Sequence, residues 1–301
     1  MKKFFKWTAI LLISWIGVIV LALAVIYAVS IVRLNHSYEI AGTPLTISSD
    51  ADTLVEGKRQ FTTRGCADCH GADGAGKLVV DDPLIGTVMA ANLTNGKGGI
   101  GATYQNSDWE RTIRHGVKPN GKPLFIMPSQ EYYPTSDSDL TALVSYVKSL
   151  APVDHTPQPI YVGPISRILH ATALFPLVPA EVIDHSAPRP RDVAKGKTKE
   201  YGEYLANTCK GCHGAGFSGG PIPGIPAQPP YPANLTADMA TGLGSWQEAD
   251  FVTALRTGMR PDGTPIATVM PWQTFQGMTD DELDALWLYL QSVPIKSAGN
   301  R

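Results

Sequence analysis

The sequence predicts an all-α protein in which an N-terminal transmembrane helix precedes two tandem copies of one small helical domain. Three observations support this fold class. The first 33 residues contain a long apolar run without charge, the rest of the chain repeats itself at a nearly fixed offset, and each copy carries apolar stripes at helical spacing. No segment shows the alternation of apolar and polar residues that predicts a β-strand convincingly.

The first segment, residues 1–33, has the composition of a membrane anchor. Lys2, Lys3 and Lys6 precede the uncharged run Trp7–Val32, whose 26 residues exceed the ~20 that a spanning helix needs. A cleaved signal peptide is the alternative, with Ala22–Ala24 as the cleavage site, but the apolar run continues beyond it. We therefore expect a retained single-pass anchor. The positive-inside rule then leaves the lysines in the cytoplasm and the rest of the chain on the periplasmic face of a bacterial cytoplasmic membrane, an oxidising compartment.

An internal duplication accounts for most of the remaining chain. Two short segments match at an offset of 142 residues: RHGVKPNGKP at 114–123 and RTGMRPDGTP at 256–265. Five pairs of residues match at an offset of 143: Cys66 and Cys209, Cys69 and Cys212, His70 and His213, Met127 and Met270, Tyr146 and Tyr289. Equal spacing of so many residues predicts two copies of one fold.

Composition places the boundaries between these copies. Eight prolines fall between residues 152 and 190, which predicts an extended connector rather than a long helix. The apolar stretch ISRILHATALFPLV at 165–178 is the exception, and we expect a short helix there that packs between the domains. The predicted organisation is a tether at 34–50, a first domain at 51–152, a connector at 153–191, a second domain at 192–295 and a tail at 296–301.

Apolar residues at helical spacing predict three helices in each domain. The strongest pattern closes each copy, and Thr279 with Glu282 forms a capping-box sequence at the start of the second of these helices. Glycine follows the middle helix in both copies. The predicted helices are 52–64, 108–115 and 138–150 in the first domain, and 194–207, 248–257 and 279–292 in the second.

Each domain contains one Cys-x-x-Cys-His pentad, in RGCADCHGADGAG from residue 64 and in TCKGCHGAGFSGG from residue 208. A disulfide across two residues would constrain little chain, and a thioredoxin-like motif expects a βαβ context that is missing. A zinc site made of four cysteines would leave the histidines and the duplication unexplained. Covalent haem attachment uses every residue, because Cys66, Cys69, Cys209 and Cys212 bind the vinyl groups while His70 and His213 ligate iron. The sequence therefore predicts two haem c groups.

With these motifs, each half resembles a class I cytochrome c domain, and residues 50–295 resemble dihaem c-type cytochromes. The stretches GVKPNGKPLFIMP at 116–128 and GMRPDGTPIATVMPW at 258–272 are similar to the cytochrome subunits of membrane-bound periplasmic dehydrogenases. The resemblance implies two tandem cytochrome c-like domains that transfer electrons. It also implies redox protein partners: a dehydrogenase, a quinol-oxidising complex or a terminal oxidase.

Met127 and Met270 are the expected sixth ligands of the two irons. Each lies 61 residues after the first cysteine of its domain, each is followed by proline, and each precedes the last helix. Buried methionines usually fill cores, but the repeat favours thioether ligation opposite histidine, the arrangement typical of cytochromes c.

Other repeated residues carry weaker expectations. Arg114 and Arg256 are interpreted either as partners of haem propionates or as solvated arginines. Tyr104 and Trp246 are interpreted as packing on the porphyrin or, by default, in the core. His115 has no counterpart in the second copy and is expected to be a surface or propionate-side histidine rather than a ligand.

These features predict an electron carrier that is not itself an enzyme. The net charge of −2 and the lack of a basic stripe argue against nucleic acid as a partner. No nucleophile–base arrangement, phosphate loop or flavin fingerprint is present. Two alternatives stay open. One is a dihaem enzyme of peroxidase-like or thiosulfate-oxidising type, and the other is a subunit whose main role is to anchor a dehydrogenase or oxidase.

Overall fold

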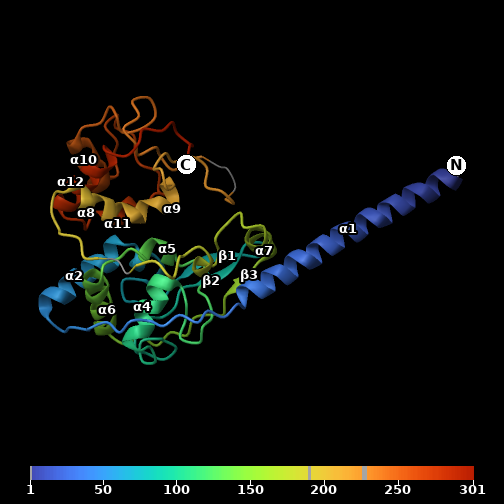
Figure 1. The fold of residues 1–301 in the computed structure, drawn as a ribbon, viewed down its shortest axis with the longest axis horizontal. Coiled ribbons are helices and arrows are strands. Elements are labelled where there is room, and N and C mark those ends of the chain that lie inside the picture. Colours follow the sequence, from blue (N-terminus) through green and yellow to red (C-terminus); the bar gives the residue numbers. More distant parts are fainter. Residues whose placement is uncertain (1, 189–190, 226–228) are drawn as a thin grey trace.

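The computed structural model describes residues 2–188, 191–225 and 229–301. Three short segments lie outside the described residues: Met1, residues 189–190 of the connector, which include Pro190, and residues 226–228 of the second domain. A long helix stands away from two small helical domains, which lie one above the other in Figure 1. The mostly helical fold predicted from the sequence is confirmed.

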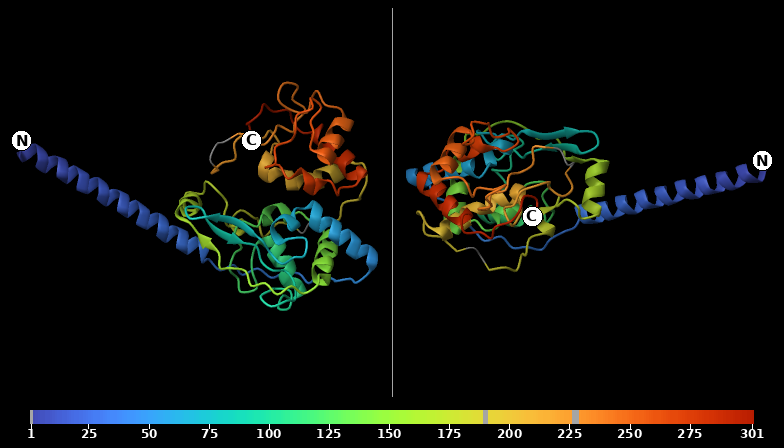
Figure 2. Two further views of the ribbon diagram at one scale, coloured as in Figure 1. Left: turned by 180° about the vertical axis from the view of Figure 1, so that it is seen from behind. Right: turned by 90° about the horizontal axis from the view of Figure 1, so that it is seen from above.

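Helix α1 (Lys2–Leu34) is long and apolar enough to span a membrane. Its best 18-residue window has a mean hydropathy of 3.0, and none of that window is buried inside the protein. Figure 2 shows that only its C-terminal end approaches the rest of the chain. The described part of the protein therefore leaves most of this helix without an apolar partner.

Each domain is built from a matched set of helices. In the second domain, Thr279 and Glu282 form the capping box that the sequence predicts. The first domain contains α2 (Ala51–Thr63), α3 (Cys66–His70), α4 (Asn106–His115), α5 (Ser129–Tyr132) and α6 (Asp137–Ser149). The second contains α8 (Lys199–Leu205), the 3₁₀ turn η2 (Ala206–Cys209), α9 (Lys210–His213), α10 (Glu248–Thr257), α11 (Trp272–Phe275) and α12 (Asp280–Leu290).

The first and last helices of each domain cross at a glycine. A Cβ on Gly57 of α2 would overlap the carbonyl oxygen of Ala142 in α6, and a Cβ on Gly202 of α8 would overlap that of Ala285 in α12. Only glycine permits so close an approach of two backbones. Around each crossing lies a separate apolar core, which includes Phe61 in the first domain.

A small antiparallel sheet lies beside the first domain, and its strands were not expected from the sequence. Strands β1 (Leu78–Asp82) and β2 (Gly86–Met89) form a hairpin, and β3 (Tyr161–Val162) adds to β2 from the connector. Asp82 stabilises the hairpin turn, because its side chain accepts hydrogen bonds from the amides of Leu84 and Ile85. The two-residue strand β3 is too short to show alternation, which is why the pattern missed it.

The tether and the connector pack against the first domain instead of running free. In the tether, the amide of Tyr38 donates to Gly121, and Leu45 is buried in the first core. The connector folds into β3, α7 (Pro164–Ala171) and the 3₁₀ turn η1 (Pro179–Glu181). The expected helix exists as α7, but its predicted place between the domains is wrong: it packs on α1.

Candidate haem-attachment sites

The first pentad forms the single turn α3. Gly65 precedes it with φ of 75° and Gly71 ends it with φ of 80°, both in the left-handed region that favours glycine. The turn therefore presents Cys66, Cys69 and His70 within one short helix. Neither cysteine forms a disulfide, and burial raises the pKa of the Cys66 thiol to about 12.

The second pentad repeats this arrangement across η2 and α9. Gly214 ends α9 with φ of 80°, the same value as Gly71 in the first domain. Cys209 and Cys212 likewise form no disulfide, and burial raises the pKa of Cys209 to about 12. His213, the last residue of α9, is buried.

Both histidines are oriented by a backbone carbonyl. His70 Nδ1 lies 2.8 Å from the oxygen of Ala91, and His213 Nδ1 lies 2.7 Å from that of Ala233. A carbonyl only accepts, so Nδ1 carries the proton and Nε2 keeps a free lone pair. Burial lowers the pKa of both histidines, which favours the neutral imidazole that a metal requires.

The loops that carry these carbonyls are fixed by matched asparagines. Asn92 Nδ2 donates to the oxygen of Val153 at 2.7 Å, and Asn234 Nδ2 donates to that of Lys296 at 2.7 Å. Each asparagine thereby ties the loop beside its histidine to the chain that follows the last helix of its domain. These contacts lie outside the predicted boundaries of the domains, at residues assigned to the connector and the tail.

The two methionines occupy matched places in the two domains. Met127 packs against the same core as Cys66, and Met270 packs against the same core as Cys209. The loop before each methionine is held in the same way, since Leu124 N donates to the oxygen of Gly116 and Ile266 N to that of Gly258, both at 2.7 Å.

These donor sets fit haem c and do not fit zinc. Each domain supplies two thiols, an imidazole with a free Nε2 and a partly buried thioether on the wall of the same core. Among the described residues, no group of three or more His, Cys, Asp and Glu side chains could hold a metal ion. The zinc alternative therefore has no ligand set in this part of the chain.

Each of the two repeated arginines pairs with the first residue of the last helix in its domain. Arg114 is buried and pairs with Glu110 at 3.0 Å and with Asp137 at 2.7 Å. Arg256 pairs with Asp280 at 2.8 Å. Asp137 and Asp280 begin the last helices, so each arginine clamps the middle helix to the start of the last one. Because Arg114 is buried between carboxylates, its interpretation as a solvated arginine is wrong, while pairing with a haem propionate stays a prediction for both arginines.

The repeated aromatic residues follow their default interpretation. Tyr104 packs against the core of the first domain and makes an edge-on contact with Trp109, with ring centroids 5.3 Å apart. Trp246 packs against the core of the second domain. Both therefore contribute to core packing.

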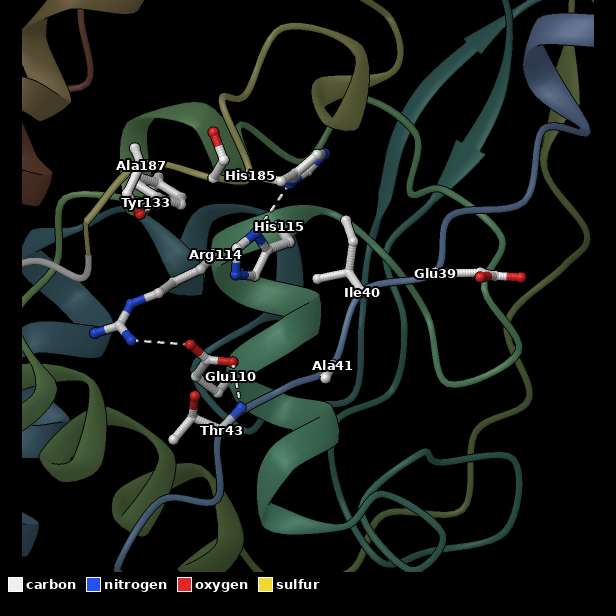
Figure 3. A pocket seen from close by; sticks show the side chains of 11 residues that line it. Glu39, Ile40, Ala41, Thr43, Glu110, Arg114, His115, Tyr133, His185 and Ala187 are labelled. Carbon is white, nitrogen blue, oxygen red and sulfur yellow. Dashed lines mark hydrogen bonds and ion pairs between the residues drawn. The ribbon is translucent and has the colours of Figure 1, made fainter.

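A separate pocket lies beside α4, and none of the predicted haem-binding cysteines or iron ligands lines it. Its volume is about 430 Å³, and it lies between the tether and the C-terminal end of α4 (Figure 3). His115 and His185 meet there with their Nδ1 atoms 2.9 Å apart. Sequence reasoning missed this pair because the two residues are 70 positions apart and neither is repeated. His115 thus contacts His185 in this pocket, and the expectation that it is not an iron ligand stays a prediction.

The domains contact each other through elements that flank the two sites. Helix α11, which follows Met270, contacts the first pentad, where Thr274 Oγ1 donates to Asp68 at 2.8 Å. Helix α5, which follows Met127, contacts the second pentad, where a Cβ on Gly211 would overlap the carboxylate of Glu131. Figure 1 shows α5 and α11 on the facing sides of the two domains.

This interface is reciprocal because the contacting residues are repeat partners. Asp68 corresponds to Gly211, and Glu131 corresponds to Thr274, in both cases at the offset of 143. Two further contacts join the domains at matched positions of the last helices. Arg59 of the first domain pairs with Glu282, the third residue of α12, and Tyr204 of the second donates to Asp139, the third residue of α6, at 2.6 Å. The two acceptors are repeat partners at the offset of 143, whereas the two donors are not. Each pentad therefore faces the partner domain across an approximate twofold relation, which no single-sequence pattern could reveal.

Comparison with known proteins agrees with this architecture. The cytochrome c family model matches residues 54–151 and 199–294. The chain is 28% identical to the cytochrome c subunit of alcohol dehydrogenase (quinone) from Gluconobacter oxydans (strain 621H), over 84% of this chain and 57% of that protein. It is 31% identical to the gluconate 2-dehydrogenase cytochrome c subunit of Pantoea cypripedii, over 82% of this chain and 61% of that protein.

A third relative matches this chain with similar identity and coverage. The fructose dehydrogenase cytochrome subunit of Gluconobacter japonicus is 30% identical over 86% of this chain and 58% of that protein. The chain thus spans about six tenths of the length of these relatives. With both family matches falling on the duplicated domains, the chain belongs to the cytochrome c family.

Proposed function

We propose that this chain is a membrane-anchored dihaem cytochrome c that carries electrons on the periplasmic face of the cytoplasmic membrane. One observation carries the proposal: the same set of two thiols, one oriented imidazole and one thioether is assembled twice, at matched positions of two domains. When bound, each haem c supplies an iron that takes up and releases one electron.

The residues of each site have separate roles. Cys66 and Cys69 would hold the first haem by thioether bonds, and Cys209 and Cys212 would hold the second. His70 and Met127 would ligate the first iron, and His213 and Met270 the second. A carrier benefits from filled positions, because the site then reorganises little on electron transfer, whereas a peroxidase-like enzyme needs one position open to its substrate. The matched methionines therefore favour the carrier over the dihaem enzyme.

The reciprocal interface supports electron passage between the two sites within one chain. Each pentad contacts the helix that follows the methionine of the other domain, through Thr274 with Asp68 and Glu131 with Gly211. Each attachment segment therefore lies at the packed interface between the two domains. We propose that electrons enter at one domain and leave from the other.

We propose a membrane-bound dehydrogenase as the redox partner of this chain. The matched relatives are named as cytochrome subunits of alcohol, gluconate and fructose dehydrogenases. We propose that this chain serves as the electron-carrying subunit of such an oxidoreductase, delivers electrons to a quinone-linked or oxidase acceptor, and uses α1 as the anchor.

A haem count tests the proposal. Purified protein should retain haem stain after denaturation, and a pyridine haemochrome assay should give two haems per chain. Replacing Cys66 and Cys69 by alanine should leave one, and the matched replacement of Cys209 and Cys212 should also leave one. A haem-free protein that contains zinc would refute the proposal.

A further inference from the structure

Helix α7 buries polar side chains and exposes apolar ones, the opposite of a surface helix in a water-soluble domain. Its buried residues are the polar Ser166 and His170, and His170 Nε2 lies 3.0 Å from a carboxylate oxygen of Glu181. Its outer face carries Ile165 and Ile168, which are 42% and 37% exposed. A surface helix in water normally buries its apolar stripe and exposes its polar one. The reversal indicates that something other than water covers the outer face.

Apolar side chains from neighbouring segments extend this face. Leu84 and Ile85, in the turn between β1 and β2, are 54% and 44% exposed. The oxygen of Leu84 accepts from the amide of Ile165, and that of Ile85 accepts from the amide of Gly163, so the turn lies directly beside the start of α7. Leu174, just after α7, is 54% exposed. We call these five residues the collar: Leu84, Ile85, Ile165, Ile168 and Leu174.

The collar is fixed to the last turns of α1. Arg167 of α7 lies over the ring of Tyr27, 4.8 Å from its centroid, and donates to Ser30 Oγ at 3.3 Å. Arg33, at the end of α1, forms an ion pair with Glu181 and donates to the carbonyl of His170. Figure 2 shows α7 and the β1–β2 hairpin beside this end of α1 in both views. The collar therefore lies at the level where the apolar run of α1 ends.

We propose that the collar inserts into the headgroup and acyl boundary of the bilayer that α1 spans, as a second contact with the lipid. This inference rests on the proposed anchor. The apolar run of 26 residues exceeds the ~20 that cross the hydrocarbon, so its last turns reach the boundary where amphipathic helices lie. Continuity with α1, whose own surface is exposed to lipid under the same proposal, favours lipid over a protein partner as the occupant. The guanidinium groups of Arg33 and Arg167 match the headgroup side of that boundary.

The contact has a consequence for orientation. A single helix leaves a domain free to tilt on the membrane, whereas a helix and a turn beside it fix the tilt. With the collar in the boundary, the first domain is held at the membrane and the second domain is held by the reciprocal interface. Both haem-attachment segments then keep constant positions relative to the membrane surface.

Photolabelling of the full haem-loaded chain in phosphatidylcholine nanodiscs tests this inference. The probe is a phosphatidylcholine with a diazirine in its acyl chain, and adducts are mapped by peptide mass spectrometry. We expect adducts on α1, on α7 and on the β1–β2 turn, and few on α12, where Leu288 is 44% exposed and serves as the matched control. The double variant I165E/I168E should lose labelling of α7 about tenfold while labelling of α1 persists. L288E should change neither.

The outcomes separate this inference from the anchor. Labelling of α1 without labelling of α7 and the turn would overturn the collar and leave the anchor intact, and the exposed face would then fit a protein partner. Absence of labelling on α1 would overturn the anchor and the collar with it. Equal labelling of α7 and α12 would also overturn the collar, because the face would not be singled out by lipid. The haem spectrum of each variant checks that it is folded.

Discussion

At the scale of single residues, the sequence predicts the two sites from the spacing of the pentads and methionines, which the duplication repeats. The attachment and ligand roles of these residues stay predictions, and the structure adds what surrounds them. The carbonyls that orient the two histidines could not be predicted from the sequence, because Ala91 and Ala233 differ from other alanines only by their position in the fold. The partners of Arg114 were missed for the same reason, because burial decides them.

The methionines give the sharpest prediction at this scale. Changing Met127 or Met270 to alanine should remove about half of the long-wavelength sulfur-to-iron absorption band and lower one of two reduction potentials, because thioether ligation raises the potential. Ferric absorption spectra and a redox titration measure both effects. Met278 is buried in the second core, and Met278→Leu should leave band and potentials unchanged. Loss of the band in Met278→Leu but not in Met270→Ala would reassign the ligand.

At the scale of elements, long helices with apolar stripes and glycine ends were predictable to within a few residues, apart from α8. That helix begins at Lys199 rather than at residue 194. The small sheet was not predictable, because β3 is contributed by two residues of a proline-rich connector. The short helix at 164–171 was foreseen, but its partner was not. The spacing of its apolar residues predicts which face of the helix is apolar, but it does not predict whether protein or lipid covers that face.

The arginines that join the middle and last helices, Arg114 and Arg256, are expected to contribute unequally to the free energy of unfolding. Arg114→Ala should lower the free energy of unfolding by about 3–5 kcal/mol, because it leaves the carboxylate of Glu110 buried without its cation. The matched change Arg256→Ala should cost only about 0–1 kcal/mol, because its partner Asp280 is mostly exposed. Denaturant unfolding of the haem-loaded protein measures both. Equal costs would mean that burial of the first clamp does not determine its strength.

At the scale of the whole molecule, the two domains act as one unit because carboxylates join them. Glu56 accepts hydrogen bonds from Arg59, Lys195 and Gln60, and Arg59 also pairs with Glu282 of the second domain. Burial acts to raise the pKa of Glu56, but these hydrogen bonds outweigh it and lower the pKa to about 2. The interface is therefore expected to weaken in acid.

The sign of this pH dependence follows from the lowered pKa. The stabilisation by Glu56 is present above its unfolded value near 4.5 and is lost as the pH falls towards 2. Because Glu56 is only partly buried, we expect Glu56→Gln to cost about 1–2 kcal/mol at pH 7 and almost nothing near pH 2. Glu200→Gln, at an exposed position of α8, is the control and should show no such trend. A cost for Glu56→Gln that is independent of pH would contradict the account.

The central claim is that one chain holds two six-coordinate haems and passes electrons without catalysing a reaction of its own. Spectroelectrochemical titration combined with carbon monoxide binding tests it most directly. The account predicts two one-electron waves per chain and poor carbon monoxide binding by the reduced protein, with one site opened in each of the Met127→Ala and Met270→Ala variants. Rapid carbon monoxide binding at one haem of the unmodified protein, together with turnover of peroxide, would contradict it.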